Sequence, residues 1–247
     1  MGKSKEVALD EQLLASAEFQ KTAMAAKLNW LRAGVLGAND GIMSTSGLVI
    51  GVAGADPSNT AAILVAGVAA LVAGSISMAG GEYTSVSAQK DSEIASLEIE
   101  RRELAENPEL ELRELTWFYE QKGMSFELAQ QVAIELTAKD ALKAHAEAEL
   151  GIEVGEHSSP TQAAFASLIA FAAGGVLPLL AITSFAPDTK IVATIVATLI
   201  ALVITGFVGA KIGGARAFRA ILRNVLVSGV TMGVTYLIGS LVGGRIG

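Results

Sequence analysis

The 18 residues EIERRELAENPELELREL, from Glu98 to Leu115, contain seven glutamates in a chain that is 51% hydrophobic. They belong to an acidic segment, residues 90–157, that holds 17 Asp and Glu against 7 Lys and Arg, a net charge of −10. The rest of the chain therefore carries +3 of the total charge of −7. A polyanion would be repelled by this segment, so nucleic acid is not an expected partner.

The remaining composition is typical of a membrane protein, with a mean hydropathy of +0.49 and only 17% charged residues. Because the chain has no cysteine, disulfides, thiolate metal sites and a cysteine nucleophile are all excluded. The first 27 residues mix Lys and Glu with Ala and Leu and lack the pattern of a cleavable signal peptide.

Five apolar segments reach the roughly 20 residues that a helix needs to cross a bilayer core of about 30 Å. They are residues 33–55, 60–86, 161–185, 191–212 and 222–244. Turn residues at 55–59 and 186–188 make hairpins of the first two segments and of the next two. The predicted fold class is all-α: a polytopic membrane protein with five transmembrane helices and a cytoplasmic three-helix acidic module between helices 2 and 3.

This pattern predicts four regions along the chain. They are a cytoplasmic N-terminal tail, transmembrane helices 1 and 2, a glutamate-rich module, and transmembrane helices 3 to 5, at residues 1–32, 33–89, 90–157 and 158–247.

Lys and Arg are unevenly distributed between the two sides of this topology. The tail, the module and residues 211–223 hold five, seven and four, whereas Lys190 and Arg245 stand alone on the other side. Since positive loops are retained in the cytoplasm, the N-terminus and the acidic module are predicted to be cytoplasmic. The lack of a targeting extension favours a prokaryotic plasma membrane over a vacuole as the host membrane.

Three helices are expected within the acidic module: residues 91–104, 109–122 and 125–150. The break at Asn107-Pro108 separates the first two, and glycines end the second and third. Glu100 with Glu103, and Glu111 with Glu114, are spaced three residues apart and so share a helix face.

If the second helix folds back on the first, these four carboxylates meet, and oxygen ligands of this kind suit Mn²⁺ and Fe²⁺. From the third helix, Glu147 and Glu149, with His145 nearby, could complete the site. An alternative is a solvated acidic face paired with Arg101, Arg102 and Arg113. Taken alone, His145 is expected to be a surface histidine.

Two further acids, Asp40 and Glu82, lie within the first two apolar segments. Each lies eight residues, about 12 Å along a helix, from a basic residue at the same membrane side, so both share one depth. Buried acids in a membrane are expensive and usually functional. Met78, one turn before Glu82, and Met43, similarly placed relative to Asp40, offer thioethers, and oxygen with sulfur favours a transition metal. Because burial raises a carboxyl pKa, metal could displace protons here.

A structural alternative makes Asp40 the N-cap of a broken helix, Glu82 an interfacial residue and the methionines packing residues. Gly-x-x-x-Gly at the five pairs 37/41, 47/51, 209/213, 229/233 and 239/243 allows close helix contact within or between subunits. Because five helices make a thin wall for a polar pathway, a homodimer is expected.

Together, four motifs resemble the vacuolar iron transporter family from about Leu28 to the end of the chain. They are LRAGVLGANDG from Leu31, SMAGGEY from Ser77, QKDSE from Gln89 and GGVLPL from Gly174. The resemblance implies a dimeric five-helix protein that carries Fe²⁺ and often Mn²⁺ out of the cytosol in exchange for protons. It implies metal ligands at Glu100, Glu103, Glu111, Glu114 and Glu149, and pathway ligands at Asp40 and Met78 with Glu82 close by.

One departure from the family is visible, because His145-Ala146 stands where relatives can have a methionine pair. No Glu-x-x-His pair occurs, which disfavours a diiron oxidase, and no enzymatic activity is expected. No cofactor is required beyond Fe²⁺ or Mn²⁺ as transported and bound ions; the expected partners are these ions, protons, the lipid bilayer and a second copy of the chain. Two alternatives stay open: a metal-sensing or scaffolding membrane protein that conducts nothing, and a transporter mainly of Mn²⁺.

Overall fold

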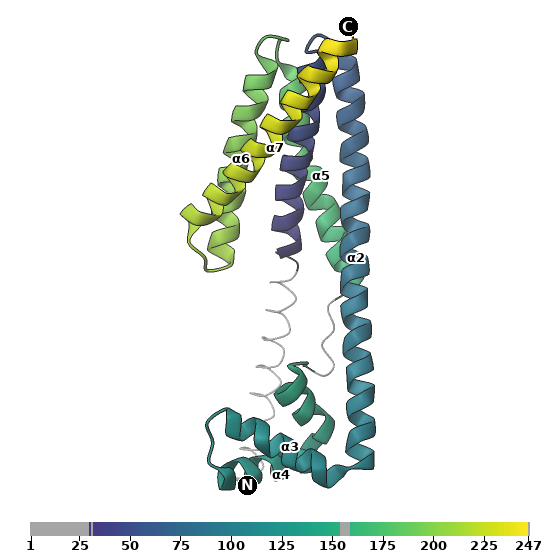
Figure 1. The fold of residues 1–247 in the computed structure, drawn as a ribbon, viewed down its shortest axis with the longest axis vertical. Coiled ribbons are helices and arrows are strands. Elements are labelled where there is room, and N and C mark those ends of the chain that lie inside the picture. Colours follow the sequence, from purple (N-terminus) through teal and green to yellow (C-terminus); the bar gives the residue numbers. More distant parts are fainter. Residues whose placement is uncertain (1–29, 31, 154–158, 247) are drawn as a thin grey trace, which may run out of the picture. The chain divides into compact units, whose positions relative to one another are not determined.

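In the computed structural model, the described residues are 30, 32–153 and 159–246, and within these ranges the regular structure is entirely helical (Figure 1). Most of the predicted N-terminal tail lies outside them. A first helix, Arg32–Ala55, precedes α2 (Thr60–Glu106), α3 (Pro108–Gln121), α4 (Phe126–His145), the π-helix η1 (Ala146–Leu150), α5 (Pro160–Ser184), α6 (Lys190–Ile212) and α7 (Ala217–Ile246). The chain forms two compact units, residues 1–84 with 159–247, and residues 85–158.

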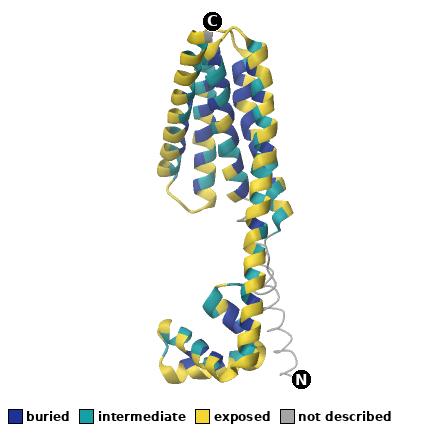
Figure 2. Cartoon of the chain, turned by 45° about the vertical axis from the view of Figure 1, so that its right-hand side comes forward, coloured by how far each residue is buried: buried dark blue, intermediate teal, exposed yellow. Residues whose placement is uncertain are grey.

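Among the described residues, five helices are long and apolar enough to cross a membrane: Arg32–Ala55, α2, α5, α6 and α7. The prediction of five membrane-spanning helices is therefore confirmed, and the chain is an integral membrane protein. The first of the two units contains these helices and is called the membrane unit. In the membrane unit, large apolar side chains are mostly exposed on the outer faces of the helices, whereas buried residues face inward (Figure 2). This distribution suits a bundle whose surroundings are lipid.

The first helix lies between α5 and α7 in the membrane unit (Figure 1). Its glycines make this packing possible, because a Cβ on Gly41 would collide with the backbone carbonyl of Phe171 in α5. On α7, Gly239 has the same relationship with the carbonyl of Gly51. Three of the five Gly-x-x-x-Gly pairs, 37/41, 47/51 and 239/243, thus serve contacts within the subunit.

The predicted turns connect the expected helices. Asp56 accepts hydrogen bonds from the backbone and hydroxyl of Ser58, and Asn59 accepts from the amide of Ala62 in the first turn of α2. Near these residues the buried Lys190 donates through Nζ to Thr60 Oγ1 at 2.9 Å, which links the start of α6 to the start of α2. The two hairpins are therefore joined by a polar contact as well as by packing.

One expected boundary is wrong. The sequence predicts a transmembrane helix ending near Val86 and a separate helix at residues 91–104, but α2 is one continuous helix of 47 residues, Thr60–Glu106. The reason is local: no glycine or proline occurs between Gly81 and Pro108, so nothing interrupts the helical hydrogen bonds. Pro108 then begins α3, where a proline in the first turn is tolerated.

In the second unit, α3 and α4 pack around a small core of Leu115, Ala133 and Ala144. Ser125 caps α4 by accepting from the amide of Leu128, and Gly123 and Gly151 have the positive φ angles of 96° and 65° that favour glycine. Within α4, Asp140 has non-helical dihedrals and its carboxylate accepts from the amide of Lys143. It therefore starts a new helical stretch that leads to His145.

Candidate metal centre and intramembrane cavity

In the second unit three buried side chains from three helices meet: Glu100 of α2, Glu111 of α3 and His145 at the end of α4. One ligand atom from each lies within 4.8 Å of the others. The Nδ1 atom of His145 is 2.9 Å from Glu100 Oε1 and 3.7 Å from Glu111 Oε2. Ligands that are about 2.1 Å from one ion lie roughly 3 to 4 Å apart, so these distances suit a single first-row metal ion.

A fourth donor comes from η1, where Glu149 Oε2 lies 3.8 Å from His145 Nδ1. The backbone here is a π-helix, a form that occurs mostly as single turns at functional sites. Both nitrogens of His145, Glu100 Oε1 and Glu149 Oε2 are buried without a hydrogen-bond partner among the described residues. Buried polar atoms without partners are costly, and an ion bound by His145 Nδ1 and the two carboxylate oxygens would satisfy these three atoms together.

The electrostatics of this cluster disfavour charge in the absence of a cation. Burial, and then the charges of Glu149 and Glu111, raise the pKa of Glu100 to about 7. Burial also raises the pKa of Glu111 and of Glu149, with further contributions from neighbouring glutamates. Burial lowers the pKa of His145, so its neutral imidazole, the form that binds metals, is favoured.

The other predicted module residues have different positions. Glu103 is exposed and Glu114 half-buried, and both lie near enough for their charges to raise the pKa of Glu111 and Glu149. Glu147 is exposed, with its carboxylate 4.0 Å from Lys143 Nζ. Arg101 pairs with the exposed Glu98 at 2.6 Å.

The expectation that His145 is a surface histidine is wrong, because its side chain is fully buried. The error came from treating the residue alone. His145 and Glu149 are four residues apart and therefore share a helix face, and this spacing was the available sequence signal.

The intramembrane residues line a second site. A cavity of about 400 Å³ between the first helix, α2 and α5 is lined by Asp40, Met78 and Glu82, with Ser44, Gly74 and Phe171 among its other residues. Asp40 lies inside a continuous helix and accepts from Ser44 Oγ at 2.8 Å. The interpretation of Asp40 as an N-cap of a broken helix is therefore wrong.

Ser44 follows Asp40 by one helical turn, and this spacing is the sequence signal that predicts a contact between the two side chains. Met43 packs against the buried cluster of Ile42, Ala201 and Leu202 and does not line the cavity. Of these two methionines, only Met78 lines the cavity together with Asp40 and Glu82.

The chain matches known proteins over most of its length. The sequence profile of the VIT family matches residues 31–240. The chain is 48% identical to a vacuolar iron transporter of Acanthamoeba castellanii over 61% of the chain and 54% of that protein. It is 39% identical to vacuolar iron transporter homolog 2 of Oryza sativa subsp. japonica over 63% of the chain and 59% of that protein.

It is also 35% identical to vacuolar iron transporter homolog 2 of Arabidopsis thaliana, over 66% of the chain and 57% of that protein. The matched regions thus span somewhat over half the length of these relatives. Because the family profile covers both the intramembrane acids and the glutamate cluster, the chain belongs to the VIT family.

Proposed function

We propose that this protein transports divalent transition metals, Fe²⁺ and/or Mn²⁺, out of the cytosol in exchange for protons. The observation that carries the proposal is the convergence of Glu100, Glu111 and His145, whose donor atoms lie within 4.8 Å of one another in a buried cluster. The names of the relatives, vacuolar iron transporter and its homologs, support metal transport.

In this proposal the second unit captures the ion. Glu100, Glu111, Glu149 and His145 bind it directly, while the more exposed Glu103 and Glu114 attract it and complete its coordination. Carboxylate and imidazole together favour Mn²⁺, Fe²⁺ and later first-row ions over Ca²⁺ and Mg²⁺, which prefer oxygen ligands alone.

Asp40, Met78 and Glu82 form the pathway within the membrane unit, since they line one cavity between the first helix and α2. Two ionised carboxylates that line one cavity in a membrane repel, and either a proton or a metal ion relieves the repulsion. Alternate occupation by protons and by metal gives the physical basis of exchange.

The distribution of Lys and Arg supports a cytoplasmic N-terminus and a cytoplasmic second unit. The relatives reported above come from an amoeba and from plants, so they lend no support to a prokaryotic plasma membrane as the host. A homodimer, with the pathway near its interface, remains part of the proposal because the cavity beside Asp40 is open in the single chain.

Transport itself is the test. The protein is reconstituted in liposomes that contain a metal-sensitive dye, a pH gradient is imposed, and entry of Fe²⁺, Mn²⁺ and Mg²⁺ is compared. Gradient-dependent Fe²⁺ or Mn²⁺ entry that disappears in Asp40→Ala, and persists in the exposed loop variant Asp188→Asn, supports the exchanger. Metal binding without flux from folded protein would contradict it and would favour a metal sensor or scaffold.

A further inference from the structure

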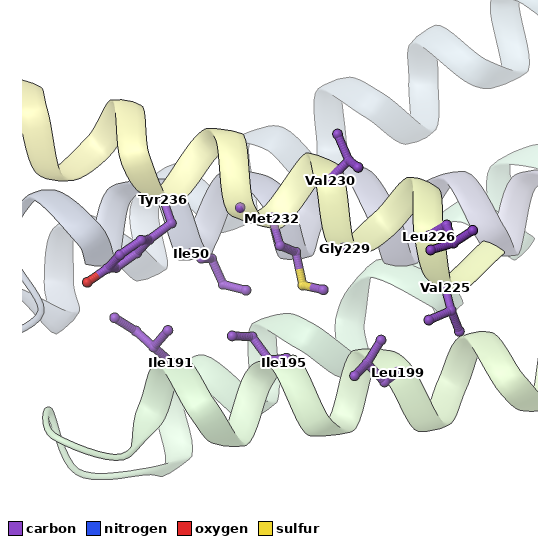
Figure 3. A pocket seen from close by; sticks show the side chains of 11 residues that line it. Ile50, Ile191, Ile195, Leu199, Val225, Leu226, Gly229, Val230, Met232 and Tyr236 are labelled. Atoms are coloured by element: carbon purple, nitrogen blue, oxygen red, sulfur yellow. The ribbon is translucent and has the colours of Figure 1, made fainter. Parts of the chain in front are cut away.

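A groove follows α6 and α7 in two separate parts, one apolar and one basic. Its apolar part has a volume of about 620 Å³ and is lined by Ile191, Ile195 and Leu199 of α6 and by Val225, Gly229 and Tyr236 of α7, with five other residues (Figure 3). Figure 3 shows the side chains of Ile191, Ile195 and Leu199 directed from α6 toward α7, and those of Val225, Met232 and Tyr236 directed from α7 toward α6. The part along α7, from Val225 to Tyr236, extends about 16 Å, which is comparable with one leaflet of a roughly 30 Å bilayer core.

The basic part is a second cavity, of about 450 Å³, between the first helix, α6 and α7. Two arginines line it, Arg32 and Arg223, together with the amides Asn39 and Asn224, and none of the described residues that line it is acidic. Asn39 Oδ1 accepts from Thr205 Oγ1 at 2.5 Å, so its amide nitrogen remains a donor. The polar side chains among the described lining residues are therefore either cationic or neutral.

The two cavities are lined by neighbouring stretches of α7. Arg223 and Asn224 line the basic one, and the next two residues, Val225 and Leu226, line the apolar one. The basic end lies where the first helix and α7 begin and α6 ends, which is one end of the membrane bundle. Phosphate would thus be bound at the membrane surface and hydrocarbon in its interior.

We propose that this groove is a binding site for an anionic phospholipid, with its phosphate between Arg32 and Arg223 and one acyl chain along the α6–α7 groove. A guanidinium donates paired hydrogen bonds to phosphate oxygens, and basic pockets between transmembrane helices bind anionic headgroups. The groove offers both halves of such a molecule their preferred surroundings. This site is separate from the metal ligands and does not depend on the proposed transport.

The test is native mass spectrometry of the full chain in detergent with dioleoyl phosphatidylglycerol, dioleoyl phosphatidylcholine and glycerol 3-phosphate. The wild type is expected to retain phosphatidylglycerol more tightly than phosphatidylcholine. Arg223→Gln should weaken phosphatidylglycerol about fivefold. The matched control is Arg219→Gln, an exposed arginine of the same helix end that does not line the cavity, which should change affinity less than twofold.

A second variant tests the apolar half. A Cβ on Gly229 meets no atom within 4 Å, so Gly229→Leu fills the groove without disturbing the fold. It should weaken both phospholipids, whereas Val234→Phe, at an exposed position of α7 outside the groove, should weaken neither.

Three results would overturn the proposal. Equal losses in Arg223→Gln and Arg219→Gln would indicate only general charge attraction. Binding of glycerol 3-phosphate as tight as that of the phospholipid would indicate a free phosphate site. Loss of a dimer in Gly229→Leu, with lipid binding unchanged, would show that a second copy of the chain covers the groove.

Discussion

His145 Nδ1 lies 2.9 Å from Glu100 Oε1, both side chains are buried, and neither atom has a hydrogen-bond partner among the described residues. The shifts in their pKa values favour a neutral imidazole and a protonated carboxyl, so the pair is not an ion pair in the absence of metal. A histidine held in this way presents a nitrogen lone pair to any cation that replaces the proton of Glu100.

Replacement of this nitrogen should change which metals bind. In His145→Leu we expect the affinity for Mn²⁺ to fall at least tenfold and that for Co²⁺ to fall further, because imidazole contributes more to later first-row ions. Isothermal titration of the full chain with each ion measures the ratio. The control is Glu147→Gln, at an exposed carboxylate of the same segment; equal losses in both variants would remove His145 from the ligand set.

Metal affinity should depend on pH because protons compete for Glu100. Its pKa of about 7 lies above its ordinary value of 4.5, so in this range the folded protein binds a proton that the unfolded chain has released. Without metal, the second unit should therefore lose stability as the pH rises from about 4.5 to 7.

With metal the trend is opposite, since each ion bound below pH 7 must displace that proton. The apparent Kd for Mn²⁺ should tighten by up to about tenfold per pH unit from 5.5 to 7 and then level off. Titrations at pH 5.5, 6.5 and 7.5 measure this trend, and a constant Kd over the range would show that Glu100 is not a ligand.

Metal should stabilise the protein through Glu111. Saturating Mn²⁺ at about 100 times its Kd should add roughly 2.7 kcal/mol to the free energy of unfolding, and EDTA should remove this gain. Glu111→Gln should abolish the gain while leaving the metal-free protein at least as stable, because one of several repelling carboxylates is gone. The measurement is the Tm with and without metal; Glu127→Gln, at an exposed position of α4, should keep the full metal-induced shift.

The glycine packing of the first helix gives a prediction that is independent of metal. Gly41→Val should prevent normal folding of the membrane unit, since its Cβ would overlap the carbonyl of Phe171. Gly34→Val, on the same helix, is the control because a Cβ there meets no atom within 4 Å. Size-exclusion profiles and thermal unfolding in detergent distinguish the two; similar profiles would contradict the packing described here.

The sequence was most informative where a single local rule decides the structure. The five spans follow from apolar length, and the starts of α3 and α4 follow from Pro108 and the capping Ser125. The continuity of α2 was missed because a change from apolar to acidic residues resembles a domain boundary, although helix geometry responds to breakers such as glycine and proline rather than to polarity.

The candidate metal site was only partly predictable for a related reason. Spacing shows that Glu100 shares a face with Glu103, but it does not show which of the two points into the interior. The burial of His145 depends on α4 packing against α3 through Leu115 and Ala144, which is a tertiary contact. No pattern within α4 alone contains that information.

The π-helical turn at Ala146–Leu150 makes the register of the last ligand tolerant of chain length. A π turn holds one residue more than an α turn, so loss of a single residue there would let the segment revert to a regular α-helix. The shorter turn would offset the lost residue, and Glu149 would stay on the face that it shares with His145. Single-residue insertions and deletions in this turn are thus a route by which related chains could change length without moving this carboxylate away from the cluster.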